Sequence, residues 1–304
     1  MSIWIGIDGG GSNLRVVGVD DDMHVIVQAM RGTVNPSAIG RDASAALMQD
    51  ALREVLATIP GASVAGVGMG VAGASAVYAG DWLRAVIAAV LPDTPVAPSS
   101  DNEIALVGAH GERRGVLLLA GTGSVAFGVN DAGESVQTGG WGYLLGDEGG
   151  GYWLGNQALR AVTLSADGIA PDAAPLSQRL LVHLGMSSAT DAITWVYRQP
   201  PPTRDIATLA SVVLEMADAG DAYTCAIIEQ GAAALVLLSD TIVARLHMTA
   251  PRIAFAGGLL TSDNSLSRAV CRRLGMTTLP EARYAPVVGA ALLAKLHYGE
   301  LPSR

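Results

Sequence analysis

The sequence of 304 residues predicts an α/β protein built from two related domains. That length exceeds what a single hydrophobic core usually needs and suits two domains. A strand, a glycine loop and a second strand open the chain, and the same pattern begins again near residue 115. GGGS at 9–12 matches GTGS at 121–124, and VGVDDD matches FGVNDAG a few residues further on. An internal repeat of this kind indicates two domains of common architecture.

In the first half, short apolar runs bounded by turn residues predict strands at 3–7, 15–19 and 24–28. Apolar positions three and four residues apart then predict a helix over 41–59. A glycine-rich apolar run at 64–73 predicts a buried strand, a helix follows near 80–90, and another strand leads to Asp101. We expect the first domain to cover residues 1–110.

In the second half, GVLLLAGTGSVAFGV predicts another strand–loop–strand unit, and RIAFAGGLL predicts a strand that ends at Gly257 and Gly258. The proline-rich segment at 198–205 is typical of a loop between helices. We expect a second domain over 111–285, and a C-terminal helix at 286–304 that packs back to complete the first domain.

The overall charge and composition argue against several kinds of partner. A formal net charge of −9 and a pI of about 4.9 are unlike the basic surfaces that bind nucleic acids or acidic membranes. No apolar run approaches the roughly 18 to 20 residues that cross a bilayer, and the N-terminus lacks the basic segment of a secretory signal. Cys225 and Cys271 form no CxxC pair. We therefore expect a reduced, cytoplasmic protein with no nucleic-acid or membrane partner.

Residue counts exclude further kinds of chemistry. The single lysine, Lys295, lies in an apolar helical pattern near the C-terminus, with no glycine loop before it. A Walker A loop, a protein kinase and a pyridoxal enzyme each need a lysine in a different setting. The five histidines form no close metal-ligand pattern, and no GxSxG nucleophile motif is present.

The glycine loops are candidates for phosphate binding. Successive backbone N–H groups in a glycine loop form a concave anion site, and the hydroxyls of Ser12, Thr122 and Ser124 could add donors. Neither loop is a dinucleotide fingerprint, since Leu14 stands where a glycine is needed and a strand follows. One such loop alone would more often be a plain hairpin. Two such loops, with Asp8 at a strand end, favour a site that binds a polyphosphate. In such a site a carboxylate holds the metal ion that accompanies the phosphates.

At this point the motifs resemble a known family. IGIDGGGSNLRVVGVD and LLLAGTGSVAFGV resemble the two phosphate motifs of the sugar kinase/actin/heat-shock ATPase superfamily, and IAFAGGLL resembles its adenosine motif. GGWGYLLGDEGGGYWLG at 139–155 is similar to the signature of its N-acetylglucosamine kinase branch, which includes bacterial glucosamine kinases. The resemblance covers essentially the whole chain. It implies two ribonuclease H-like (actin-like ATPase) domains with a cleft between them, ATP and Mg²⁺ as cofactors, and a homodimer.

The resemblance also implies a role for individual residues. Asp8 would hold Mg²⁺ through water, and Asp101 would be the general base that takes the proton from the 6-hydroxyl of the sugar. The residues implied to bind ATP and its phosphates are Gly10, Gly11, Ser12, Gly121, Thr122, Gly123, Gly257 and Gly258. The residues implied to contact the sugar are Asn35, Asp101, Trp141, Gly142 and Asp147.

Several residues have a plainer interpretation beside the functional one. Asn35 precedes a proline and could simply begin a turn, and Glu148 could be a charge near a helix N-terminus. Tyr152 and Trp153 are expected in the core. Asn13 departs from the expected pattern after the GGGS loop.

The predicted function is phosphorylation of N-acetylglucosamine at its 6-hydroxyl, with glucosamine as the alternative substrate. Two other hypotheses are an ATPase activator of a 2-hydroxyacyl-CoA dehydratase and a sugar sensor without catalysis. The activator needs cysteine thiolates for an iron–sulfur cluster, and neither Cys225 nor Cys271 lies in a glycine motif. The sensor would not need Asp8 or Asp101, and both are present.

Overall fold

The computed structural model describes residues 2–11, 13–73, 76–198 and 201–299, with the side chains of 76–78 left outside that description. The chain divides into two compact units. Unit 1 comprises Met1–Gly115, Val129–Gly133 and Glu281–Arg304, and unit 2 comprises Val116–Gly128 and Glu134–Pro280. The C-terminal segment therefore belongs to the same unit as the N-terminal strands.

Unit 1 contains a five-stranded sheet in the order β3-β2-β1-β4-β5. Its strands are β1 (Ser2–Gly9), β2 (Asn13–Val19), β3 (Val25–Gly32), β4 (Ser63–Val71) and β5 (Val96–Ser99). β1, β4 and β5 pair in parallel, whereas β2 is antiparallel to both β1 and β3. Every strand except β2 therefore points the same way, and four carboxyl ends meet at one edge of the sheet.

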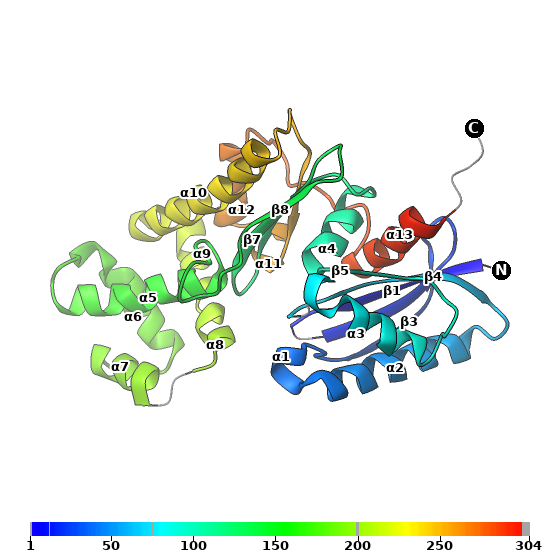
Figure 1. Ribbon diagram of the computed structural model, residues 1–304. Coiled ribbons are helices and arrows are strands. Elements are labelled where there is room, and N and C mark those ends of the chain that lie inside the picture. The colour runs from blue at the N-terminus through cyan, green and yellow to red at the C-terminus, as the bar shows by residue number, and fades with distance from the viewer. Residues whose placement is uncertain (1, 12, 74–75, 199–200, 300–304) are drawn as a thin grey trace. The chain divides into compact units, whose positions relative to one another are not determined.

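Helices cover both faces of this sheet (Figure 1). They are α1 (Pro36–Ile39), α2 (Arg41–Thr58), α3 (Ala76–Ala88), α4 (Asp101–His110) and α13 (Pro286–Tyr298). Alternate side chains of a strand face opposite sides, and β1 follows that rule. Ile5 and Ile7 join the core formed with α2 and α3, whereas Trp4 joins the cluster formed with α13.

The packing of α13 depends on three glycines. A Cβ atom at Gly6 of β1 would lie 1.9 Å from the carbonyl oxygen of Val287, and one at Gly68 of β4 would lie 1.7 Å from that of Ala290. Gly289 lies in α13 itself, where a Cβ atom would lie 2.1 Å from the carbonyl oxygen of Ile104 in α4. These are backbone contacts, which cannot relax by moving a side chain. α13 is thus fixed against the sheet and α4 together.

Unit 2 contains most of a four-stranded sheet in the order β8-β7-β6-β9. Its strands are β6 (Gly115–Ala120), β7 (Ser124–Val129), β8 (Ser135–Gly139) and β9 (Ile253–Ala256). The helical elements are α5 (Gly151–Ala166), the 3₁₀ turn η1 (Pro171–Ala173), α6 (Ala174–His183), α7 (Ala189–Arg198), α8 (Thr203–Thr208), α9 (Ala210–Asp218), α10 (Ala222–Arg245), α11 (Gly258–Thr261) and α12 (Ser265–Arg273). Buried residues of β6, α5, α9, α10 and α12 form one continuous hydrophobic core.

The helix α10 differs from the sequence-based expectation that no apolar run could cross a membrane. By length and composition alone it could do so, although core helices of soluble proteins pass the same test. Ile227, Ile228 and Leu235 of α10 are buried in the core of unit 2. The helix packs against α9, α12 and β8. The buried part of its apolar surface is therefore used for packing inside the unit.

The structure confirms the predicted α/β class and both strand–loop–strand openings, which are β1–β2 and β6–β7. Some boundaries differ. β3 continues to Gly32 because Gly32 pairs with Asn13 at the start of β2. The C-terminal helix predicted at 286–304 is observed over Pro286–Tyr298, and residues 300–304 lie outside the described ranges.

We predict that Gly68→Ala destabilises the protein, because the new methyl group would overlap the α13 backbone. Overpacking of this kind costs about 1–3 kcal/mol or more. Gly32→Ala is the matched control, since Gly32 is also in a strand and a Cβ atom there meets nothing within 4 Å. Urea unfolding should show a lower midpoint for Gly68→Ala only. Equal midpoints for the two variants would contradict the close packing of α13.

Candidate functional site

The carboxyl edge of the five-stranded sheet gathers the candidate residues of unit 1. Asp8 is next to last in β1 and pairs in register with Gly70 of β4. Asp101 follows β5 and is the first residue of α4, while Asn35 lies in the loop after β3. Because four strands end at this edge, residues far apart in the sequence are brought together.

Asp8 is a partly buried carboxyl group. Burial is the main cause that raises its pKa to about 6; the nearby carboxyl of Asp101 raises it further, and Arg15 opposes the shift. Arg15 lies on β2 directly opposite Asp8 in the strand pairing. At neutral pH the group is charged, but at a cost that a bound cation would relieve.

Asp101 occupies a helix N-terminus. Ser100 caps α4 by accepting a hydrogen bond from the Glu103 N–H, and Oδ1 of Asp101 accepts one of 3.1 Å from the Asn102 N–H. Burial raises the pKa of Asp101, and the backbone N–H groups of Asn102 and of Asp101 itself oppose that shift. A carboxylate held there is fixed in position and is a stronger base than an exposed one.

The donor set suits a hydrated Mg²⁺ ion. Within the described ranges there is no group of three or more His, Cys, Asp or Glu side chains that could form a complete metal site. Mg²⁺ is usually held by one or two carboxylates together with waters and substrate phosphates. Asp8, with Asp101 near enough to raise its pKa, fits that pattern.

The loop between β1 and β2 is closed by its own backbone. The Gly10 N–H donates a hydrogen bond of 2.9 Å to the Asn13 carbonyl. A Cβ atom at Gly11 would meet nothing within 4 Å, so neighbouring protein atoms do not require glycine there. A ligand that approaches the backbone would explain the open space. Ser12 lies outside the described residues.

Asn35 has the structural role that the plainer interpretation assigned to it. Its Oδ1 accepts a hydrogen bond of 2.9 Å from the Ser37 N–H and caps α1. A Cβ atom at Gly73 would lie 2.4 Å from the same oxygen. Gly73 has φ +74°, which also favours glycine. The amide nitrogen of Asn35 forms no hydrogen bond with a described residue and is the part of the side chain left for a ligand.

In unit 2, two glycine loops lie side by side at the ends of parallel strands. β6 and β9 pair up to Leu119 and Ala256, and a Cβ atom at Gly257 would lie 2.2 Å from the Ala120 carbonyl oxygen. Gly257 has φ +78°. By contrast, Cβ atoms at Gly121 and Gly258 would meet nothing within 4 Å. The two loops form one glycine-lined surface with open space above it.

The loop before α5 fixes Asp147 against the first of these glycine loops. Asp147 has a left-handed backbone with φ +64°, and a Cβ atom at Gly123 would lie 2.2 Å from its Oδ2. Burial raises its pKa, while N–H groups of Ser124 and Gly142 oppose the shift. Its Oδ1 is buried without a hydrogen-bond partner among the described residues. Such an acceptor is the kind of atom that a ligand hydroxyl would satisfy.

Trp141 differs from the other candidates of this loop, because 76% of its surface is exposed. Leu144 and Leu145 beside it are also exposed. Gly142 has φ +90° and open space at its Cβ position. Unit 2 thus presents an exposed apolar surface next to Asp147.

The remaining residues of this motif have structural explanations. Tyr152 and Trp153 pack against the core of unit 2, as expected. The side chain of Glu148 is exposed, and its carbonyl oxygen accepts a hydrogen bond of 2.8 Å from the Ser124 hydroxyl. That hydroxyl is consequently not available as the phosphate donor that the sequence suggested.

Sequence reasoning missed two residues at the carboxyl edge of unit 1. Arg15 places a positive charge near Asp8, and the only available signal was its position between the apolar residues of β2. Gly73 receives the Asn35 side chain. The sequence offered GVAGAS at 70–75, which contains Gly73, as small residues that could leave room for an acetyl group; residues 74–75 lie outside the described ranges, and the contact of Gly73 with a loop more than 30 residues earlier was not predicted.

Two curated relatives align with most of the chain. An N-acetylmuramic acid/N-acetylglucosamine kinase from Clostridium acetobutylicum is 30% identical over 271 residues, which cover 88% of this chain and 88% of the relative. An N-acetyl-D-glucosamine kinase from Dictyostelium discoideum is 28% identical over 321 residues, covering 96% of this chain and 97% of the relative. These relatives confirm the resemblance that the glycine motifs indicated.

The fold is also similar to a solved structure. A protein from Chromobacterium violaceum, provisionally named an N-acetylglucosamine kinase, superposes with a TM-score of 0.71 at 24% sequence identity. The match covers 96% of this chain and 98% of that protein, and at this identity it concerns the fold alone. A family description matches residues 5–294. The chain therefore belongs to the BadF/BadG/BcrA/BcrD ATPase family.

Proposed function

We propose that this chain is an ATP-dependent amino-sugar kinase that transfers the γ-phosphoryl group to the 6-hydroxyl of N-acetylglucosamine. The observation that carries the proposal is the pair of partly buried carboxyl groups, Asp8 and Asp101, at one edge of the unit 1 sheet. Its class, a phosphotransferase acting on an alcohol group, follows from the ATPase family and from the two kinase relatives. We further propose that the two compact units are the two domains expected from the sequence.

In this proposal Asp101 is the general base. Phosphoryl transfer to a hydroxyl needs a carboxylate that accepts the hydroxyl proton as the new bond forms. The raised pKa of Asp101 strengthens it as a base, and the α4 N-terminus keeps its carboxylate in one orientation. Partial burial also excludes much of the water that would compete with the sugar as acceptor.

Asp8 is proposed to hold the Mg²⁺ that accompanies ATP. When bound there, the metal would supply positive charge that neutralises the charge developing on the phosphate groups. Asp8 would contact the hydrated ion and gain a favourable counter-charge, which offsets the cost of its burial. Arg15, close to the same carboxyl, adds positive charge that favours phosphate binding.

The glycine-lined surface of unit 2 is proposed to hold the nucleotide. The open Cβ positions at Gly121 and Gly258 allow phosphate oxygens and the adenosine to approach the backbone closely. Gly257 is glycine for an additional reason, since its backbone has φ +78° and touches the β6 strand end. Gly10 and Gly11 supply the corresponding loop in unit 1.

We propose two polar groups as sugar contacts. One is the amide nitrogen of Asn35, whose Oδ1 is already used as a helix cap. The other is the buried Oδ1 of Asp147, which suits a donating sugar hydroxyl. Trp141 can place an exposed apolar face against the ring. Glucosamine uses the same contacts and remains the alternative substrate.

The cysteines argue against the alternative of a dehydratase ATPase activator. Bridging cluster ligands must be accessible thiolates. Cys271 is buried in α12 and burial raises the pKa of its thiol. Cys225 is half-buried in α10, with its sulfur 3.6 Å from the Ala217 carbonyl oxygen. Neither thiol has the exposure that a shared cluster needs.

We predict that Asp101→Asn reduces turnover by roughly 100- to 10,000-fold, which is the usual contribution of a general base. ADP release from Mg·ATP would be measured with N-acetylglucosamine, N-acetylmuramic acid, glucosamine, glucose and no sugar. The native protein should respond to an N-acetylated amino sugar most strongly. The exposed Asp93→Asn is the control and should retain native turnover.

Binding measurements keep the interpretation of Asp101→Asn clear. Calorimetry should show that the variant still binds the sugar, because the substitution removes the general base and leaves the rest of the binding site intact. Its stability should be retained at neutral pH, since a carboxyl with a raised pKa costs free energy when charged. Native turnover in Asp101→Asn, or ADP release that is independent of sugar, would contradict the proposal.

We predict a pH-dependent stability difference between the native protein and Asp8→Asn. The pKa of Asp8 is about 6 in the folded protein, against about 3.9 for an ordinary Asp. The folded state therefore binds more protons between these values, and native stability should fall as the pH rises through that window. Asp8→Asn should lack this fall, so it gains stability relative to the native protein above about pH 6.

Mg²⁺-dependent ADP binding should show the opposite trend. The metal needs the charged carboxylate, so native binding should weaken as the pH falls below about 6, with weak binding by Asp8→Asn at every pH. Urea unfolding and calorimetry at several pH values would measure both effects. Asp93→Asn should follow the native protein in each. Identical profiles of stability against pH for the native protein and Asp8→Asn would contradict the buried environment that raises the pKa of Asp8.

A further inference from the structure

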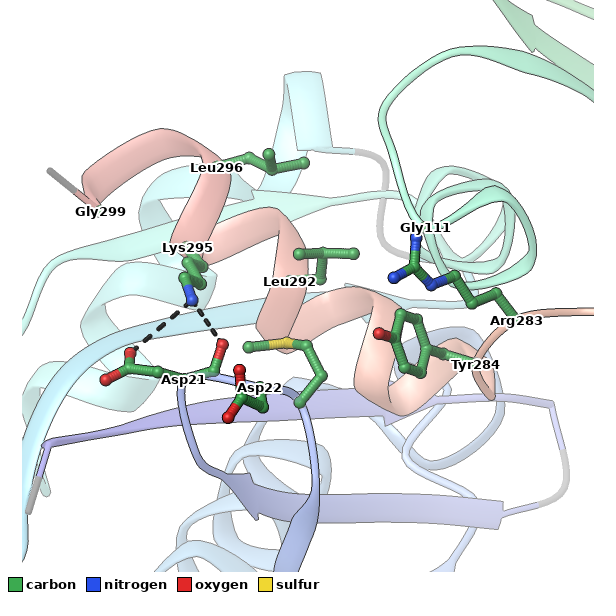
Figure 2. Close-up of a pocket in the computed structure, with 10 residues that line it drawn as sticks. Asp21, Asp22, Gly111, Arg283, Tyr284, Leu292, Lys295, Leu296 and Gly299 are labelled. Atoms are coloured by element: carbon green, nitrogen blue, oxygen red, sulfur yellow. Dashed lines mark hydrogen bonds and ion pairs between the residues drawn. The ribbon is translucent and has the colours of Figure 1, made fainter. Parts of the chain in front are cut away.

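A separate pocket lies in unit 1, and no residue of the proposed catalytic site lines it. It has a volume of about 360 Å³, within the range of small-molecule sites. Three parts of the unit meet there: the turn between β2 and β3, the helix α13, and the segment of Arg283 and Tyr284. Figure 2 shows Arg283 and Tyr284 on one side of the pocket, with Asp21, Asp22 and Lys295 on the other. Because the turn follows β2, the pocket lies at the sheet edge opposite Asp8.

One pair of charges in the pocket is already satisfied. Lys295, the only lysine of the chain, donates a hydrogen bond to the Asp21 carbonyl oxygen and lies 3.8 Å from the Asp21 carboxylate. Lys295 and Asp21 therefore neutralise each other. This contact also connects α13 to the turn between β2 and β3.

The other two charged groups have no such partner. Among the described residues, no carboxylate forms an ion pair with Arg283, and no cation forms one with Asp22. The Arg283 guanidinium lies 5.2 Å from the centre of the Tyr284 ring. Stacking on a ring holds the guanidinium in place and leaves its edge free for a carboxylate or phosphate.

Apolar side chains line the rest of the pocket between these charges. They come from Met23, which is buried, and from Leu292 and Leu296 on α13. The pocket therefore offers one free cation, one free anion and an apolar surface, counted over the described residues that line it. A purely anionic ligand would meet Asp22 unfavourably, and a purely cationic one would meet Arg283 unfavourably.

We propose that this pocket binds a small amphoteric metabolite. A carboxylate or phosphate of the ligand pairs with Arg283, an ammonium group pairs with Asp22, and a short apolar part covers Leu292 and Leu296. Carboxylate and phosphate share the geometry that a guanidinium edge recognises. Nothing in this assignment requires the ligand to resemble ATP or a sugar.

The position of the pocket connects it to the helix that carries Asp101. Gly111, which caps the C-terminus of α4, lines the pocket, while Asp101 is the first residue of α4. The Arg283 and Tyr284 N–H groups donate hydrogen bonds of 3.0 and 2.9 Å to the carbonyls of Ala109 and Gly108. A ligand held by Arg283 would thus act on the end of α4. We infer an effector site, and this regulatory part rests on the proposed kinase function.

Calorimetric titration without ATP or sugar tests the binding independently of catalysis. The probes are L-leucine, which carries carboxylate, ammonium and an apolar side chain, and O-phosphoethanolamine, which carries phosphate and ammonium. The matched probes 4-methylpentanoate and ethyl phosphate lack the ammonium group. Arg283→Gln and Asp22→Asn should each weaken binding by about tenfold or more, the usual loss for a charge-assisted contact. The controls Arg53→Gln and Asp93→Asn alter exposed residues outside the pocket and should bind as the native protein does.

Each result has a definite meaning. Saturable binding of leucine alone assigns a carboxylate ligand, and binding of O-phosphoethanolamine alone assigns a phosphate ligand. Binding that survives Asp22→Asn, or equal binding of the probes without ammonium, overturns the amphoteric assignment. No binding of either amphoteric probe overturns the site itself. A bound probe that leaves kinase turnover unchanged overturns only the regulatory part.

Discussion

The close contact between α13 and the glycines of unit 1 is the constraint on which the rest of the structure depends. Gly6 and Gly68 let the helix backbone touch the sheet, and Gly289 lets the same helix touch α4. At these three glycines no side chain separates the backbones, so backbone contacts help to determine the position of α4 relative to β1. Asp101 begins α4 and Asp8 is next to last in β1, and their mutual distance depends on this packing. A chain segment from the far C-terminus thereby organises residues from the first third of the sequence.

That packing holds two carboxyl groups near each other and partly out of water, which costs stability. Burial raises the pKa of both Asp8 and Asp101, which is the direction expected when the charged carboxylate is disfavoured. Natural proteins retain such an arrangement where it serves chemistry. In the function that we propose, the same burial that penalises the charged forms would make Asp101 a better base and favour cation binding at Asp8. Unit 2 shows a similar compromise at Asp147, which combines a left-handed backbone with a buried oxygen that no described residue satisfies.

Much of the fold follows from local patterns, whereas the site depends on contacts between distant residues. Alternating apolar residues and glycine loops predicted β1–β2 and β6–β7, and the apolar stripe at 41–59 predicted α2. The structure showed that the Asp147 carboxylate lies against Gly123, and that the Ser124 hydroxyl donates to the Glu148 carbonyl. These two contacts depend on how the loop before α5 folds back onto the loop after β6, and such contacts leave no periodic pattern in the sequence. The cap formed by Asn35 was visible as an Asn-Pro turn, but its contact with Gly73 was not. In the sequence, Glu229 and Asp240 interrupt the apolar residues of α10, whereas the structure shows one continuous helix that could cross a membrane by length and composition alone.

The chemical identity of the product tests the central claim most directly. The native protein would be incubated with Mg·ATP and N-acetylglucosamine, and phosphorus and proton NMR would follow every phosphorus-containing species. Our account predicts one new phosphate monoester, coupled to the two protons on carbon 6 of the sugar and formed in equal amount with ADP. Release of inorganic phosphate in place of a sugar ester, at the same rate with and without the sugar, would contradict it.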